Sequence, residues 1–148
     1  MENLELVKEQ AQELLSKASI DAKVDVSEDE NGYHVSVDTE ENALLIGKHG
    51  NTLSSFEYLL AQILAAKTGE YKRVIVEVGG YREERENYLK DLANRLKEEV
   101  LATDSEKTIR GLKPWERRYV HMLLAEDSDV LTESEGEDRD RVLVIKKK

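Results

Sequence analysis

Apolar and polar residues alternate at two different spacings at the start of the chain. Residues 2–17 repeat apolar side chains at helical spacing, whereas residues 20–26 and 33–37 alternate apolar with polar side chains, as strands with one solvent-facing side do. Asn31-Gly32, the usual signal of a hairpin turn, lies between the two strand segments. The pattern predicts a helix followed by an antiparallel hairpin.

Two consecutive helices and a buried strand are predicted next. A short helix over about residues 41–46 is followed by a longer one over about residues 52–67, which ends at Gly69. Residues 71–78 are apolar on both faces, as expected for a buried strand. Gly79-Gly80 then interrupts the pattern, so that the element order up to this point is α-β-β-α-α-β.

A long helix is predicted over residues 81–102, with an apolar stripe that contains Tyr81 and Leu92. Its other face carries bases interleaved with glutamates: Arg82, Arg85, Lys90, Arg95 and Lys97. Such a face is typical of a solvated helix whose opposite charges pair at i, i+4 spacing. We expect this helix to open a second domain, residues 80–148, after a first one over residues 1–79.

The remainder of the second domain is predicted to be a small α/β unit. Its helix runs from Pro114, a residue suited to a first helical turn, to about Leu124. Segments with strand character lie on both sides of it: residues 106–111, Val130-Leu131 and residues 142–145. An acidic turn over residues 133–138 joins the last two, and the terminal lysines, residues 146–148, are expected to form an exposed, frayed tail.

The composition narrows the class of protein. The 148 residues contain no cysteine, which excludes disulfide bonds and thiolate metal sites and is compatible with a reducing compartment. No apolar run approaches the length that spans a bilayer, and the acidic first residues do not resemble a signal peptide. We therefore expect a soluble, cytoplasmic protein without membrane insertion, and the sequence indicates no metal or other cofactor.

The distribution of charge along the chain indicates more about binding of nucleic acid than the net charge does. A net charge of −10 argues against indiscriminate binding of nucleic acid. Acids dominate residues 1–42, with twelve acids and three bases, and residues 125–140, with eight acids and Arg139. Residues 107–121, by contrast, contain five bases and one acid, Glu116. A local cationic region within an acidic chain suits selective binding.

A glycine-bounded, cationic turn, Gly47-Lys48-His49-Gly50, separates the two consecutive helices of the first domain. Glycine permits positive φ and leaves no Cβ to hold a partner away. The first N–H groups of the following helix have no internal acceptor, and the helix dipole favours an anion there. The four residues therefore resemble the G-x-x-G loop with which a KH domain grips a nucleic-acid backbone. The structural alternative is an ordinary corner between two helices.

A second candidate site lies in the helix that begins at Pro114. Arg117 and His121 are four residues apart and therefore share one helical face, with Lys113 and Arg118 beside them. Arginine offers a planar fork of donors suited to phosphate, and an imidazole can donate a hydrogen bond or stack on a base. A histidine on a helix is more often structural, so the pair alone does not identify a site.

The surrounding residues add a family resemblance. Residues 114–121, followed by Ser134-Glu135-Gly136 and residues 141–145, resemble the R-3-H domain, which is named for an arginine and a histidine with three residues between them. The preceding order, with G-x-x-G between two helices, resembles a type II KH domain. The two domains in this order, joined through residues 80–85, resemble the bacterial Jag family, also called KhpB or EloR.

The resemblance implies an α+β fold. Its first part is a type II KH domain, a three-stranded sheet with helices on one face, and its second part is a small α/β R-3-H domain. It also implies a cytoplasmic RNA-binding protein that takes part in post-transcriptional regulation and cell elongation. The expected ligand is single-stranded RNA, with single-stranded DNA as an alternative, and the expected protein partner is a small KhpA-like KH protein or a second copy of the chain.

The resemblance also carries over residue roles. Gly47, Lys48, His49 and Gly50 match the KH loop, Arg117 and His121 match the pair that names the second domain, and Arg141 matches a basic position after the Ser-x-Gly turn. His49 stands where the family commonly has arginine, so the loop gains its second charge only when the imidazole is protonated. Members commonly carry a further N-terminal domain, for which these residues leave no room, so we do not expect partners that bind through it.

Two other classes of function stay open at this point. The first is a protein-interaction adaptor that uses the KH fold as a docking face, which the acidic residues 1–42 favour. The second is an enzyme acting on nucleotides, for which His121 with a carboxylate such as Glu116 would supply acid–base groups. Against an enzyme, the sequence contains no P-loop, no paired metal-ligand spacing and no nucleophile–base pair.

Overall fold

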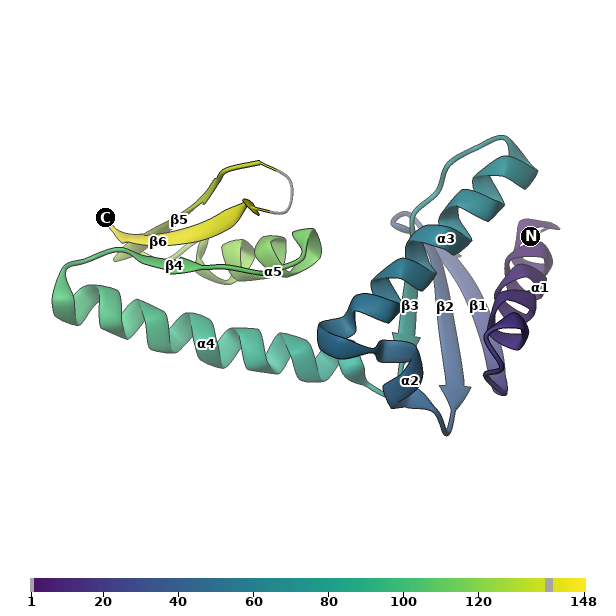
Figure 1. Ribbon diagram of the computed structural model, residues 1–148. Helices are drawn as coiled ribbons and strands as arrows, with labels where there is room; N and C mark the ends of the chain where they lie inside the picture. The colour runs from purple at the N-terminus through teal and green to yellow at the C-terminus, as the bar shows by residue number, and fades with distance from the viewer. Residues whose placement is uncertain (1, 138–139) are drawn as a thin grey trace. The chain divides into compact units, whose positions relative to one another are not determined.

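The computed structural model describes residues 2–137 and 140–148 (Figure 1). The chain forms two compact units, which divide after Arg82 and are described one by one here as the N-terminal unit and the C-terminal unit. Both are mixtures of helices and an antiparallel or mixed sheet, which confirms the predicted α+β class.

The N-terminal unit has the predicted element order. Its elements are α1 (Glu2–Lys17), β1 (Ala22–Asp29), β2 (Gly32–Thr39), α2 (Asn42–Ile46), the 3₁₀ turn η1 (Lys48–Gly50), α3 (Asn51–Thr68) and β3 (Val74–Val78). The strands lie in the order β1-β2-β3, with β1 antiparallel and β3 parallel to β2. A parallel pair requires a crossover connection, and the two helices with the corner between them supply it.

Helices cover one face of this sheet (Figure 1). Along β2, Tyr33, Val35 and Val37 are buried against α1 and α3, while Ser36 and Asp38 are exposed on the opposite face. This alternation is the one that the apolar pattern predicted. The predicted strand over residues 71–78 was too long at its start, because β3 pairs with β2 only from Val74, opposite Tyr33.

The C-terminal unit is built on one long helix and a three-stranded sheet. It contains α4 (Tyr81–Thr103), whose first two residues belong to the N-terminal unit, followed by β4 (Lys107–Ile109), α5 (Pro114–Leu124), β5 (Val130–Glu135) and β6 (Val142–Lys147). The strand order is β4-β6-β5, with antiparallel pairs throughout. Leu89 and Val100 of α4 are buried in one core with Val120 of α5 and Leu143 of β6.

The predictions for the last strands need correction. Lys146 and Lys147 are not a frayed tail but belong to β6, where Lys146 is paired with Glu133, and the Lys148 N–H donates to Asp129 O at 2.9 Å. The acidic turn predicted over residues 133–138 begins later than expected, because β5 extends to Glu135. Residues 138 and 139 of that prediction lie outside the described residues.

The charged face of α4 also differs from the prediction. Arg85 binds Glu116 of α5, and Lys97 binds Asp127, which lies between α5 and β5. The Lys97 ammonium donates to the Asp127 carboxylate, and this bond raises the pKa of Lys97 and lowers that of Asp127. Two of the five bases predicted to pair along the helix therefore connect α4 to other elements of its unit.

Candidate nucleic-acid interface

The glycine corner between α2 and α3 is a closely packed turn that only glycine fits. Gly47, His49 and Gly50 all have positive φ, at 72°, 56° and 74°. A Cβ at position 47 would lie 2.1 Å from Thr52 Oγ1, and one at position 50 would lie 2.5 Å from the hydroxyl oxygen of Tyr81. Both glycines are therefore required by space as well as by conformation.

The cationic side chains of this corner are directed to solvent. Lys48 and His49 are exposed, whereas Gly50 is buried under Tyr81. The N-cap of α3 is Gly50, which has no side chain to accept from the first N–H groups of the helix. Backbone donors, the positive end of an 18-residue helix and a lysine thus lie together at an accessible turn. This arrangement suits a phosphate group.

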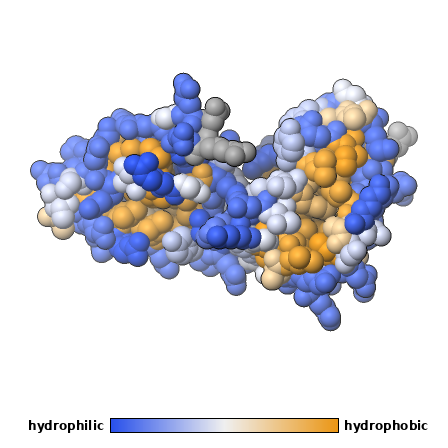
Figure 2. Space-filling model, viewed as in Figure 1, coloured by the Kyte–Doolittle hydropathy of each residue, from blue (hydrophilic) through white to orange (hydrophobic). Residues whose placement is uncertain are grey.

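Apolar side chains are exposed on the helices that flank the corner. Leu44 of α2 is 57% exposed, and Leu59 of α3 is 46% exposed. Figure 2 shows apolar surface over α2 and α3 on the face that it presents. An extended strand held at the corner would therefore have both a polar clamp for its backbone and apolar surface for its bases.

One residue of this region was missed by the sequence reasoning. Glu57 lies on α3, half-buried, and its Oε2 accepts a hydrogen bond of 3.1 Å from the Val76 N–H of β3. Burial raises the pKa of its carboxyl group, while that hydrogen bond acts in the opposite direction. The signal was in the sequence, because position 57 has the spacing of the apolar stripe formed by Leu53, Leu60 and Leu64.

In the C-terminal unit, two of the predicted arginines line one cleft. The cleft has a volume of about 1030 Å³ and is lined by Gly111, Leu112, Pro114, Arg117, Glu137, Asp140 and Arg141. Arg117 donates to Leu112 O at 2.7 Å, and Arg141 donates to Gly136 O at 3.3 Å. These bonds hold each guanidinium by one nitrogen, and an arginine has five N–H donors in all. The cleft is suited to an anion, although Glu137 and Asp140 also border it.

The other predicted residues of this unit lie around the cleft. His121 is exposed, and its Nδ1 is hydrogen-bonded to Thr132 Oγ1 of β5. Arg118 is exposed, and Lys113 is the N-cap of α5. The described lining of the cleft contains Arg117 and Arg141 but not Lys113, Arg118 or His121. The structure thus brings two of the five predicted residues together at one opening.

Glu116, considered in the sequence as a possible acid–base partner of His121, is instead a buried residue that binds two other groups. Its side chain is 2% exposed, and it accepts from the Arg85 Nε and, at 2.8 Å, from the Lys113 N–H. The bond to Lys113 is the glutamate half of a capping box, in which the third residue of a helix reaches back to its N-cap. Lysine is not a usual N-cap residue, so the sequence signal was limited to an acid two residues after Pro114, the residue suited to the first turn. Because both partners hold Glu116 in the core, it does not serve as the carboxylate of an acid–base pair with His121.

The part of the chain that the structure describes has neither a cluster of metal-binding side chains nor a helix suited to span a membrane. Residues 2–137 and 140–148 contain no group of three or more histidines and carboxylates arranged to hold a metal ion. Across the same ranges, no helix has both the length and the apolar character needed to cross a membrane.

Comparisons with known proteins agree with this division into two sites. A family model described as KhpA/KhpB, KH domain, matches residues 4–78, and a model of the R-3-H domain matches residues 87–147. Each of the two models thus covers one of the two candidate sites.

Similar proteins include three that are named RNA-binding protein KhpB. That of Clostridium symbiosum is 32% identical over 127 residues, that of Bacillus subtilis (strain 168) is 36% identical over 118 residues, and that of Lactiplantibacillus plantarum is 31% identical over 132 residues. The matches cover 86%, 78% and 89% of this chain, but only 57%, 56% and 41% of the relatives. The chain thus spans about half the length of the curated relatives that it matches.

Proposed function

The chain belongs to the KhpB, or Jag, family of proteins with a KH domain followed by an R-3-H domain, and from this premise we propose that it binds single-stranded RNA. The names of its relatives support RNA as the ligand. We propose the KH domain to be residues 1–79 and the R-3-H domain to be residues 80–148. Single-stranded DNA is the alternative ligand, because phosphate contacts do not distinguish the two.

The observation that carries the proposal is the exposed cationic corner. Lys48 and His49 are directed to solvent at the start of α3, where backbone N–H groups and the helix dipole attract an anion. Gly47 and Gly50 allow the turn to pack against Thr52 and Tyr81, and this packing holds Lys48 and His49 at the surface. The corner would hold about four nucleotides, as KH loops do.

The cleft beside α5 supports a second contact. Arg117 and Arg141 border the same opening and are each held by a backbone carbonyl, so their remaining N–H donors have a defined orientation. We propose that they bind a phosphate or a terminal nucleotide, with Arg118, Lys113 and His121 as outer contacts. Glu137 and Asp140 at the rim would limit how much negative charge the cleft accepts.

A salt titration tests the proposal. Fluorescence anisotropy of a labelled single-stranded RNA with the 148-residue chain should show saturable binding that weakens steeply as salt rises. The slope of affinity against salt reports the number of phosphates contacted. Weak, unsaturable binding at physiological salt would contradict the proposal and favour an adaptor.

An adaptor that docks proteins on the KH fold is the second candidate. It is favoured by the acidic residues 1–42, which carry twelve acids and three bases, and by the half-charged loop at His49. We propose no catalytic activity, since the matched families are binding domains and Glu116, the carboxylate considered beside His121, is bound to Arg85.

The cellular role is proposed from the family alone. We propose a cytoplasmic post-transcriptional regulator linked to cell elongation and cell-wall control, with a small KhpA-like KH protein or a second copy as partner. Crosslinking the protein to RNA in its own cells, followed by sequencing of the attached RNA, tests this role.

A further inference from the structure

Glu57 occupies a position in α3 that the apolar pattern reserves for a hydrophobic residue. It follows Leu53 by four residues and precedes Leu60 by three, and both leucines are buried. Residues at these spacings share one helical face. A carboxylate on such a face loses hydration, and burial raises the pKa of Glu57 for this reason. Packing alone therefore does not explain a glutamate here.

The carboxylate of Glu57 lies at the unpaired edge of the sheet. β3 is the last strand in the order β1-β2-β3, and the Tyr33 N–H of β2 donates to Arg73 O at 2.9 Å. Along a strand, the backbone N–H and C=O groups of successive residues point alternately to its two sides. Because the Arg73 C=O points toward β2, the backbone groups of Val76, three residues later, point away from β2. The Val76 N–H accordingly donates not to a strand but to Glu57 Oε2, at 3.1 Å.

This contact changes what the edge offers to a ligand. The Val76 N–H, which would otherwise be a free donor, is already bound, and the Val76 carbonyl faces the same edge. Glu57 Oε1 makes no hydrogen bond to the described part of the chain, and each carboxylate oxygen accepts more than one bond. The edge beside Glu57 therefore offers several acceptors to a ligand, and the cations that act on its carboxylate are Arg82 and Arg73.

The acceptors are within reach of a strand held at the glycine corner. Glu57 follows Gly50 by seven residues, which is about 10.5 Å, or two turns, along α3 at 1.5 Å per residue. Residues two turns apart lie on nearly the same side of a helix. Four nucleotides spaced at about 3.4 Å or more cover a length of about 10 Å. By length, a gripped segment of four nucleotides therefore spans the distance from the corner to Glu57.

We propose that Glu57 is a specificity-determining residue that reads a guanine base of the RNA strand held at the Gly47–Gly50 corner. The proposal rests on the RNA-binding function proposed above and adds a base preference to it.

The preference follows from the donors of each base. Guanine places two neighbouring donors, N1–H and the 2-amino group, on its Watson–Crick edge, and a carboxylate accepts through two oxygens. Adenine and cytosine place one amino group beside an unprotonated ring nitrogen, whose lone pair would face a carboxylate oxygen. Uracil has one donor between two carbonyl oxygens. Among the four bases, guanine matches an acceptor pair best.

Anisotropy titrations with modified RNAs test the proposal on the full 148-residue chain. The probe is a uridine-rich, labelled, single-stranded RNA with guanosine at every third position, compared with the same RNA carrying inosine, which lacks only the 2-amino group. The wild-type protein should bind the guanosine RNA about fivefold or more tightly, as expected for loss of part of a bidentate contact.

Glu57→Gln is the variant that addresses the residue itself. Its amide oxygen still accepts from the Val76 N–H, but its amide nitrogen replaces an acceptor by a donor. The ratio of guanosine to inosine affinity should fall close to one while RNA binding persists. The matched control is Glu9→Gln, which removes the same charge from an exposed residue of α1; it should keep the wild-type ratio.

The outcomes separate the inference from the proposed function. Equal ratios in the wild type and Glu57→Gln, or a wild type that does not distinguish guanosine from inosine, would overturn the role of Glu57 and leave RNA binding intact. A wild type that binds none of these RNAs would overturn both. The wild-type comparison requires no variant to fold, and circular dichroism melting establishes whether Glu57→Gln is folded.

Discussion

Arg85 of α4 binds the carboxylate of Glu116, which is 2% exposed in α5, and so joins the two helices of the C-terminal unit through a buried ion pair. Glu116 also accepts from the Lys113 N–H at the start of α5. Both carboxylate oxygens of Glu116 are therefore bound, and these bonds hold the first turn of α5 in place. The same helix carries Arg117, a candidate residue for binding phosphate.

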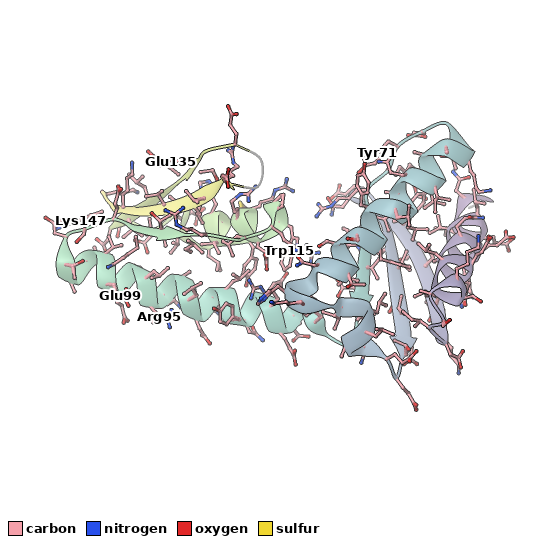
Figure 3. The ribbon with its side chains drawn as sticks, in the orientation of Figure 1. Tyr71, Arg95, Glu99, Trp115, Glu135 and Lys147 are labelled. Carbon is pink, nitrogen blue, oxygen red and sulfur yellow. The ribbon has the colours of Figure 1, made fainter. Side chains whose placement is uncertain are left out.

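Replacing Arg85 should therefore destabilise the C-terminal unit. Arg85→Ala leaves the Glu116 carboxylate buried with its charge unpaired, which we expect to lower the free energy of unfolding by about 3 kcal/mol. Urea denaturation followed by circular dichroism measures the change. Arg95→Ala on the same helix is the control, since Arg95 is exposed and points away from the sheet of its unit (Figure 3). A loss as small as that of the control would show that the ion pair adds little.

Reversing the charge of the glycine corner should abolish most RNA binding. In the Lys48→Asp/His49→Asp double variant, two acidic groups would repel a phosphate at an exposed turn, without loss of core contacts. Anisotropy should show a large loss of affinity and a smaller salt slope, with an unchanged melting temperature. The control is Lys8→Asp/Lys23→Asp, which removes exposed lysines elsewhere in the same unit. Affinity like that of the wild type in the corner variant would exclude this turn as the main contact.

Filling the space at Gly50 should strain the corner. Gly50→Ala places a Cβ 2.5 Å from the Tyr81 hydroxyl oxygen at a residue with φ of 74°, so we expect a loss of stability of about 1–3 kcal/mol. Adding Tyr81→Phe removes the nearest atom and should restore part of the loss, because the strain of positive φ remains. Thermal melting of the single and double variants measures the two contributions, the clash with the Tyr81 hydroxyl and the strain of positive φ. No recovery in the double variant would mean that the hydroxyl oxygen does not set the cost, which would then come from φ and from the ring carbons of residue 81 at 3.0 and 3.1 Å.

Arg117 and Arg118 should contribute differently to RNA binding although they are adjacent in sequence. Arg117 lines the cleft and is oriented by Leu112 O, whereas Arg118 is exposed outside the described lining. Arg117→Ala should weaken RNA binding by about 1–3 kcal/mol, the range for a hydrogen bond to a charged group. Arg118→Ala removes the same charge and should cost less. Equal losses in anisotropy titrations would point to general electrostatic attraction rather than to the cleft.

Glu57 should make stability depend on pH in a particular direction. Burial raises its pKa above the ordinary glutamate value of 4.5, while Arg73 and Arg82 lower it and Glu77 raises it further. The folded protein then holds this proton more tightly than the unfolded chain, so the contribution of Glu57 to stability falls as pH rises above about 4.5 through the raised pKa.

Glu57→Gln removes this dependence. The free energy of unfolding of the variant, relative to the wild type, should therefore increase between pH 4 and pH 7, as measured by urea denaturation at each pH. A difference between the two proteins that stays constant across this range would contradict a raised pKa for Glu57.

The alternation of apolar residues predicted the helices and the hairpin well, because each element of the N-terminal unit buries one face. Val35 and Val37 are buried, and Ser36 between them is exposed, as the pattern requires. The start of β3 was missed because it depends on pairing with Tyr33, which a local pattern does not contain. The terminal position of Lys146 and Lys147 predicted a frayed tail, yet pairing with β5, which lies apart from them in sequence, holds both in β6.

The candidate site was predictable where it depends on neighbours in sequence. The glycine corner and the helix from Pro114 to Leu124 lie where the motifs placed them. The partners of Arg85 and Glu57 were not predictable, because Glu116 and Val76 are 31 and 19 residues away in sequence. Tyr81, taken as one residue of an apolar stripe, lies against Gly50, a contact that only the folded chain creates.

The contact between Glu57 and the Val76 N–H has a consequence for self-association. An unpaired edge strand is a template on which strands of other molecules can add and aggregate. An approaching strand would bring a carbonyl oxygen to the Val76 N–H and meet a carboxylate already bound there, so that acceptor would face acceptor. We therefore expect Glu57 to disfavour intermolecular β-pairing at the edge where β3 has no strand neighbour among the described residues, and to leave this edge open to ligands that bring donors.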